Sequence, residues 1–344
     1  GVDVVRLPVP AVAWVLRLLA EDLGRTALVV LPGEGDVQAF CEAAELFGLT
    51  GTVSFPAPSL TPYQETEISL SVRAQEAVAL DRLARGDARV AATTPRALFR
   101  RLPPSAAFLE RARELVPDTE HEMAELTAWL LRAGYRRTDL VTEVGDFAVR
   151  GGVFDLFPPG QEEPVRLDFF GDTLESIRRF ERMSQRSEER LDRTRVLPLS
   201  PFPAGAVAAE ALAESLTRRL DGGLSDEGRR RLEQLASSGG FPGWEGWLPA
   251  LGGAEASLVE YLSDPLVVAV DPPALTEEVE RHAAALAADH TARRSHRRLA
   301  LPPEELEHPL ERVQAVLDAA SVRVRDLVVG SVAGRVDFAA STTD

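Results

Sequence analysis

Apolar and polar positions along the first hundred residues alternate between helical and strand periods. Three amphipathic helical patterns are interleaved with three short apolar runs: Ala11–Leu23, Ala27–Leu31, Asp36–Phe47, Gly51–Phe55, Ser71–Ala84 and Ala88–Thr93. Short apolar runs between such helices are typical of buried parallel strands. The pair Thr94-Pro95 predicts a further helix, capped by the threonine and running through Arg101. The pattern predicts an α/β doubly wound half of the kind found in nucleotide-binding domains.

The middle of the chain changes to a strand-rich pattern. Prolines 103 and 104 and the acidic run from Pro117 indicate a boundary, and one helix at Met123–Ala133 precedes strands over Asp139–Arg179. The proline-rich segment Val196–Pro203 is interpreted as the exit linker.

The remainder returns to helices and one apolar strand. Helices are predicted over Val207–Leu220 and Asp226–Ala236, and the strand Pro265–Val270 ends at Asp271, which we expect to cap the next helix. We infer that this part completes the first α/β domain, so that the small sheet is an insertion. The expected divisions are residues 1–117 for the first part of the α/β domain, 118–203 for the insertion, 204–310 for a helical subdomain with the completing segment, and 311–344 for a linker or tail. The end of the tail, Ser331–Asp344, has little to pack with.

One predicted strand of the insertion has an unusual outer face. Within Pro164–Phe170, the side chains of Val165, Leu167 and Phe169 form a plain core face, whereas Arg166, Asp168 and Phe170 face the other way. An aromatic residue beside an arginine at a solvent-facing position is typical of protein interfaces. Arg150, just before Gly151-Gly152, adds a second arginine to the preceding strand.

A structural interpretation of the same residues stays open from periodicity alone. In that interpretation Phe170 covers the hairpin turn at Phe170-Gly171-Asp172, and both arginines pair with Asp168, Glu162 or Glu163.

Composition narrows the possible functions. The 344 residues include 45% hydrophobic and 27% charged residues, as in ordinary globular proteins, and no apolar run approaches the roughly 20 residues of a membrane span. We expect a cytoplasmic monomer without membrane contact. The net charge of −16 argues against a dedicated nucleic-acid binder. The arginine clusters of the helical part are interpreted as solvated helix faces.

Metal and nucleotide chemistry are not supported by the residues present. The single cysteine, Cys41, excludes an intrachain disulfide and is expected to pack as a small core residue, and the five histidines have no ligand spacing. All 38 basic residues are arginines, so the lysine of a P-loop is missing. Gly33-Glu34-Gly35 follows a strand, but it lacks the third glycine of a dinucleotide fingerprint. The strand before Asp271 ends in Asp271-Pro272, whereas an ATPase strand would end in Asp-Glu to hold Mg²⁺ and orient water. We therefore expect no cofactor, no metal and no catalytic residue.

Three blocks of the sequence carry a resemblance to a known family. They are Ser59-Leu60-Thr61-Pro62-Tyr63, Val90–Leu98 and, above all, Gly145–Ser187, followed by Leu197-Pro198. Over roughly residues 10–310 the chain resembles the UvrB-homology module of the Mfd family of transcription-repair coupling factors. The resemblance implies a degenerate RecA- or UvrB-like parallel-sheet domain with an inserted antiparallel α+β domain, and a module that has lost its ATP site.

The resemblance also implies a role. Family members recruit UvrA to RNA polymerase stalled at DNA damage, and the UvrA-contacting positions correspond to Arg150, Arg166 and Phe170. The interval Phe55–Val72 is too short for the DNA-clamping hairpin of UvrB, so DNA clamping is not implied. In the full-length family protein, this surface is masked by the C-terminal domain, and RNA polymerase and DNA are bound by domains absent from this chain. Two alternatives stay open: an autoinhibitory intramolecular domain, and a UvrB-type DNA-damage ATPase, which the missing lysine disfavours.

Overall fold

The two ends of the chain together build one parallel sheet. The computed structural model describes residues 2–5, 7–57, 60–219, 223–325 and 336–337. Seven strands pair in the order β16-β1-β15-β14-β2-β4-β3, and every neighbouring pair is parallel. Their bounds are β1 Val2–Val5, β2 Ala27–Val30, β3 Thr52–Ser54, β4 Val90–Thr93, β14 Leu266–Val270, β15 Val322–Arg325 and β16 Val336–Asp337.

Helices cover both faces of this sheet, which is why the neighbouring strands β2 and β14 are apolar throughout. Helices α1 (Val9–Leu23) and α2 (Glu34–Leu46) pack on one face. The other face is covered by α3 (Leu70–Ala84), the 3-10 helix η1 (Pro95–Phe99), α8 (Pro272–Ser295) and α10 (Leu310–Asp318), with Phe108 of α4 (Ser105–Glu110) in the same core. The predicted α/β fold with a parallel sheet is confirmed. Cys41 packs against the core beneath α1 and α2, as expected.

Two local predictions differ from the structure. Residues 311–325 are not a linker, because they form most of α10 and then β15, which lies between β14 and β1 in the sheet. The four residues of β15 alternate valine with arginine, and so short a pattern does not identify a strand before its neighbours are known. Most of Ser331–Asp344 lies outside the described residues. The segment after Thr94 is the short 3-10 helix η1, and the Thr94 side chain does not cap it.

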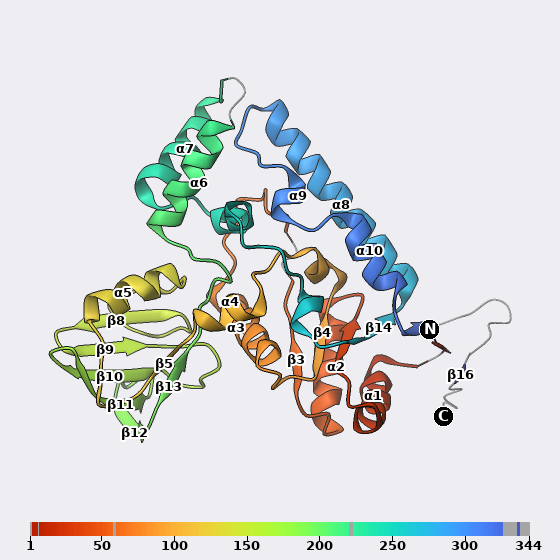
Figure 1. Cartoon of the computed structure of the whole chain (residues 1–344), viewed down its shortest axis with the longest axis horizontal. Helices are drawn as coiled ribbons and strands as arrows, with labels where there is room; N and C mark the ends of the chain where they lie inside the picture. The colour runs from red at the N-terminus through yellow and green to blue at the C-terminus, as the bar shows by residue number, and fades with distance from the viewer. Residues whose placement is uncertain (1, 6, 58–59, 220–222, 326–335, 338–344) are drawn as a thin grey trace.

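The insertion leaves and re-enters the α/β part through two paired strands, β5 (Arg113–Leu115) and β13 (Thr194–Val196). Between them the chain forms a second sheet in the order β12-β11-β10-β9-β8-β7, with β6 added beside β11. Its elements are β6 Thr119–Glu120, α5 Met123–Arg132, β7 Arg136–Arg137, β8 Asp146–Arg150, β9 Val153–Leu156, β10 Val165–Phe170, β11 Thr173–Phe180 and β12 Ser187–Leu191. Figure 1 shows this small sheet and α5 at the side of the molecule opposite β16.

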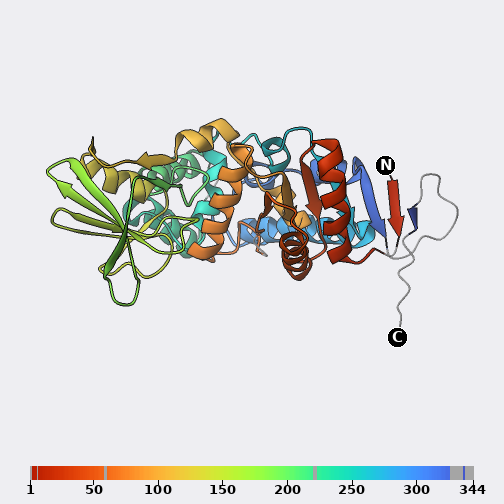
Figure 2. The ribbon, with the colours of Figure 1, turned by 90° about the horizontal axis from the view of Figure 1, so that it is seen from below.

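A helical part connects the insertion to β14. It contains α6 (Ala206–Arg218), α7 (Asp226–Ser238), the 3-10 helices η2 (Trp244–Leu251) and η3 (Leu258–Tyr261) and, after α8, α9 (Pro303–Leu306). Figure 2 shows the parallel sheet and the small sheet separated along the long axis of the molecule. The Asp271 side chain accepts a hydrogen bond from the Ala274 amide at the start of α8, as predicted. Among the described helices, none is both long and apolar enough to cross a bilayer.

Candidate partner-binding surface

The two faces of the small sheet have different surroundings. Its inner face carries the alternate apolar residues of β8 to β11, and these pack beneath Leu126, Trp129 and Leu130 of α5. Val165, Leu167 and Phe169 belong to this buried set, whereas Arg166 and Asp168 are half-buried and Phe170 is exposed. The predicted alternation along β10 is therefore confirmed.

The half of the outer face that lies away from the β10–β11 turn holds a small apolar cluster of its own. Ala148 of β8, Phe157 after β9 and Phe180 of β11 are buried together with Val141. Val141 lies in the loop over residues 139–145, which crosses the outer face before β8 begins. A second loop over residues 181–186 joins β11 to β12, and the Gln185 side chain donates to the Val141 carbonyl at 3.4 Å. The two loops therefore meet over this half of the sheet.

Arg166 is tied into this outer layer by a two-pronged ion pair. Its Nε and Nη2 donate to the two carboxylate oxygens of Asp155 at 2.7 and 2.9 Å, and Asp155 lies directly opposite it on β9. The guanidinium also lies over the Phe180 ring, 4.8 Å from its centroid. The Asp155 side chain is only 6% exposed and that of Arg166 is 21% exposed. The hydrogen bonds from Arg166 to Asp155 raise the pKa of the guanidinium. Arg166 is thus a fixed, charge-compensated residue.

Phe170 stands apart from this network. It ends β10, and a tight turn at Gly171-Asp172 leads back into β11, with Gly171 at a φ of +60° that suits glycine. The residue is 77% exposed. An aromatic ring that is held on a hairpin and left in water is a large apolar contact surface for a partner.

Arg150 is the last residue of β8 and lies at the same end of the strands as Phe170. Its partner across the β8–β9 hairpin is Val153, which is itself opposite Asp168 on β10. The register therefore places Arg150 and Asp168 in one row of the outer face. Arg166 lies in the next row toward the start of β10, and Phe170 lies in the next row toward its end. The Arg150 Nη2 donates to the backbone carbonyl of Asp139.

The structure thus brings the three predicted residues to one face but gives them unequal surroundings. Arg166 forms its ion pair with Asp155, and not with the Asp168, Glu162 or Glu163 of the structural interpretation. Asp168 pairs instead with Arg178 at 3.1 Å. Sequence reasoning missed Asp155. The alternation Phe154-Asp155-Leu156 was the available signal, because it points an aspartate outward from a buried strand.

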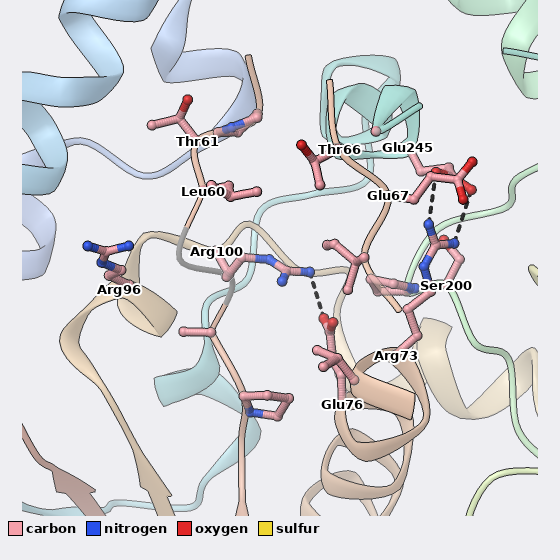
Figure 3. Close-up of a pocket in the computed structure, with 18 of the residues that line it drawn as sticks. Leu60, Thr61, Thr66, Glu67, Arg73, Glu76, Arg96, Arg100, Ser200 and Glu245 are labelled. Atoms are coloured by element: carbon pink, nitrogen blue, oxygen red, sulfur yellow. Dashed lines mark hydrogen bonds and ion pairs between the residues drawn. The ribbon is translucent and has the colours of Figure 1, made fainter. Parts of the chain in front are cut away.

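A separate cavity of about 480 Å³ lies at the carboxyl end of the parallel sheet. Its lining includes Glu34 after β2, Pro56 after β3 and Arg96 after β4, so it occupies the edge where α/β sheets bind ligands. The loop over Leu60–Ser69, the start of α3 and residues of η2 complete the wall. Figure 3 shows part of the lining of this cavity.

Three of the four arginines that line this cavity are paired with carboxylates, and the fourth, Arg101, donates to backbone carbonyls. Arg73 makes two hydrogen bonds to Glu245 at 3.0 and 2.9 Å, and Arg100 contacts Glu76 at 2.7 Å (Figure 3). Arg96 is paired with Glu278. Burial raises the pKa of Glu34, which stands where an anionic phosphate would approach after β2. A polyphosphate would have to displace several carboxylates here, and no lysine exists to bind it. Among the residues that the structure describes, no group of three His, Cys, Asp or Glu side chains could hold a metal ion.

Comparison with known proteins places the small sheet in a family. Residues 114–202 match the family model of the UvrB interaction domain. Most of the chain is similar to transcription-repair-coupling factors: 32% identical over 292 residues to that of Myxococcus xanthus, covering 78% of this chain and 23% of the relative. The protein of Mycobacterium bovis is 31% identical over 302 residues (83% and 24%), and that of Escherichia coli 32% over 197 residues (57% and 16%). The chain thus spans less than a quarter of the length of these three relatives.

Proposed function

Because this chain belongs to the family of transcription-repair-coupling factors, with residues 114–202 as its UvrB interaction domain, we propose that it is a non-catalytic module that binds UvrA. In the whole protein, this binding would recruit UvrA for excision repair at sites where RNA polymerase has stalled. In the whole protein, RNA polymerase and DNA would be bound by other domains, and the C-terminal domain would mask the surface of this module.

The observation that carries the proposal is the exposure of Phe170 on the outer face of the matched domain. A phenylalanine that is 77% exposed gains little from intramolecular packing, whereas burying such an aromatic anchor at an interface is worth about 2 kcal/mol or more. Arg150 and Arg166 lie on the same face in neighbouring rows. We therefore propose Arg150, Arg166 and Phe170 as the UvrA-binding residues, with Phe170 as the apolar anchor.

The cavity at the end of the parallel sheet supports the non-catalytic part of the proposal. Three of its four arginines are paired with carboxylates within the chain, and its lining carries five glutamates against four arginines: Glu34, Glu67, Glu76, Glu245 and Glu307, against Arg73, Arg96, Arg100 and Arg101. A nucleotide triphosphate would meet net negative charge there.

Competition with UvrB tests the proposal. If the domain uses the UvrA surface that UvrB uses, the chain should displace labelled UvrB from UvrA in a concentration-dependent way. The Phe170→Ala variant should not displace it, whereas Leu131→Ala, which removes an exposed leucine from α5 on the opposite side of the sheet, should compete like the wild-type chain. Failure of the wild-type chain to compete would count against the shared surface.

A further inference from the structure

Three arginines lie side by side on neighbouring strands of the outer face. Arg166 of β10 lies directly opposite Arg178 of β11, and Arg178 lies directly opposite Arg190 of β12. Side chains in such positions point to the same face of the sheet, with Cβ atoms about 5 Å apart. In the other direction the row continues to Asp155 of β9 and Ala148 of β8, so it carries three guanidinium groups and one carboxylate.

The positive charge continues into the next row toward the β10–β11 turn. That row holds Arg150 of β8, Asp168 of β10 and Ser176 of β11. The two rows together carry four arginines and two aspartates, although the net charge of the chain is −16. Like charges directly opposite each other on neighbouring strands destabilise a sheet. An anionic partner would compensate this local excess of positive charge.

The guanidinium groups of Arg178 and Arg190 are each held on one side. Arg178 pairs through Nη2 with Asp168 at 3.1 Å, and its Nε donates to the Ser176 hydroxyl at 3.3 Å. Within the described residues, the Arg190 side chain makes one hydrogen bond, from Nη2 to the Glu175 carbonyl at 3.3 Å. A guanidinium has five N–H donors, so both side chains are oriented and still have donors for a partner.

We propose that Arg178 and Arg190 belong to the partner-binding surface, and that the row of arginines binds a group of carboxylates on UvrA. This inference rests on the proposed function and adds two residues to Arg150, Arg166 and Phe170. At a strand spacing of about 4.8 Å and a rise of about 3.4 Å per residue, four strand spacings and four residues span roughly 19 by 14 Å. A patch of this size fits within one interface of ordinary size.

Arg179 provides a matched control for this face. It follows Arg178 on β11 but lies opposite Val165, whose side chain belongs to the buried inner face. Its ion pair is with exposed Glu189 at 3.0 Å. The side chains of Arg178 and Arg179 are 45% and 46% exposed, so the two residues differ mainly in the face toward which they point.

The variant Arg190→Glu separates contact with the partner from a structural role. Its carboxylate would lie opposite Arg178, so an ion pair would replace two like charges on neighbouring strands. The free chain should therefore melt at the wild-type temperature or above, while UvrA binding should weaken at least about tenfold. Weaker binding together with a lower melting temperature would give Arg190 a structural role and overturn its assignment as a contact.

Calorimetric titration with UvrA tests the row as a whole. Arg178→Ala and Arg190→Ala should each weaken binding by about fivefold or more, because a hydrogen-bonded charge pair is lost. Arg179→Ala should bind with the wild-type Kd. Wild-type affinity should fall between about 50 and about 300 mM salt, and it should fall less when Arg178 and Arg190 are both replaced by alanine.

The outcomes distinguish this inference from the proposed function. If Phe170→Ala loses affinity while Arg178→Ala and Arg190→Ala bind like the wild-type chain, the proposed function stands and the added contacts are wrong. Equal losses in Arg178→Ala and Arg179→Ala would also contradict a contact specific to the outer face. Absence of binding by the wild-type chain would overturn both.

Discussion

At the residue scale, Arg166 and Phe170 illustrate two different uses of the same face of one strand. Arg166 compensates the buried carboxylate of Asp155 and covers the Phe180 ring, so its removal affects the folded state. Phe170 is held by its hairpin and touches little else, so its removal affects only what binds there. Reduced UvrA binding in an Arg166 variant would therefore not by itself establish contact with the partner.

We predict that Arg166→Ala destabilises the chain by about 3 kcal/mol, because it leaves the Asp155 carboxylate buried without its cation. Urea unfolding followed by circular dichroism measures this change. Arg193→Ala should stay within about 0.5 kcal/mol of the wild-type chain, since its side chain and that of Glu114 are exposed. The double variant Asp155→Leu/Arg166→Ala should recover part of the loss, because no charge is then left buried. Equal stabilities of Arg166→Ala and Arg193→Ala would show that the pair does not hold this face.

The alternation Val165-Arg166-Leu167 was sufficient to assign the two faces of β10, because the side-chain period of a strand is two. The partner of Arg166 could not be predicted, because it depends on the register between β9 and β10. An eight-residue connection, residues 157–164, separates these strands, and nothing in its sequence fixes which residues lie opposite. The predictions for Arg150, Arg166 and Phe170 as contacts of UvrA stay predictions.

At the element scale, the hairpins and loops of the small sheet determine what the outer face presents. The β8–β9 turn lies against β10, since the Gly152 carbonyl accepts the Phe169 amide at 2.7 Å. A Cβ atom on Gly152 would lie 2.6 Å from the Phe169 carbonyl oxygen, whereas one on the neighbouring Gly151 would have no atom within 4 Å. The close approach of two backbones requires glycine at position 152.

Gly152→Ala should destabilise the chain by about 2 kcal/mol, because the clash involves backbone atoms that cannot rotate away. Gly151→Ala should cost about 1 kcal/mol, because its φ of +60° is unfavourable for alanine but its surroundings are open. Thermal unfolding of the two variants, side by side, gives the comparison. A smaller loss in Gly152→Ala than in Gly151→Ala would contradict the close packing of this turn on β10.

Most elements could be predicted from periodicity, and the exceptions have physical reasons. Long amphipathic helices such as α3 and buried strands such as β4 carry clear patterns. Strand β15 was missed because its four residues alternate valine with arginine, and so short a pattern is recognised as a strand only from its pairing with β14 and β1. The loop 139–145 was predicted as part of the strand-rich block. Its packing could not be predicted, because Val141 of this loop is buried by Phe157 and Phe180, which come from other parts of the sheet.

At the scale of the whole molecule, the fold separates a nucleotide-type framework from the proposed binding surface. The carboxyl end of the parallel sheet keeps the location of a ligand site, but three of its four arginines pair with Glu76, Glu245 and Glu278 within the chain. The small sheet lies at the other end of the molecule from β16 (Figure 1), and Phe170 on its β10–β11 hairpin is exposed. The missing lysine and the inserted sheet were both visible in the sequence, whereas the ion pairs of the cavity depend on contacts across 24 to 182 residues of chain.

The measurement that tests the central claim most directly is a calorimetric titration of the 344-residue chain into UvrA from the same organism, with Phe170→Ala and Leu131→Ala titrated in parallel. The account predicts saturable binding by the wild-type chain and by Leu131→Ala with the same Kd. Phe170→Ala should bind at least about 30-fold more weakly, which corresponds to about 2 kcal/mol for the lost aromatic anchor, and should melt at the wild-type temperature. Absence of binding by the wild-type chain, or equal Kd values for Phe170→Ala and the wild type, would contradict the assignment of this face as the UvrA-binding surface.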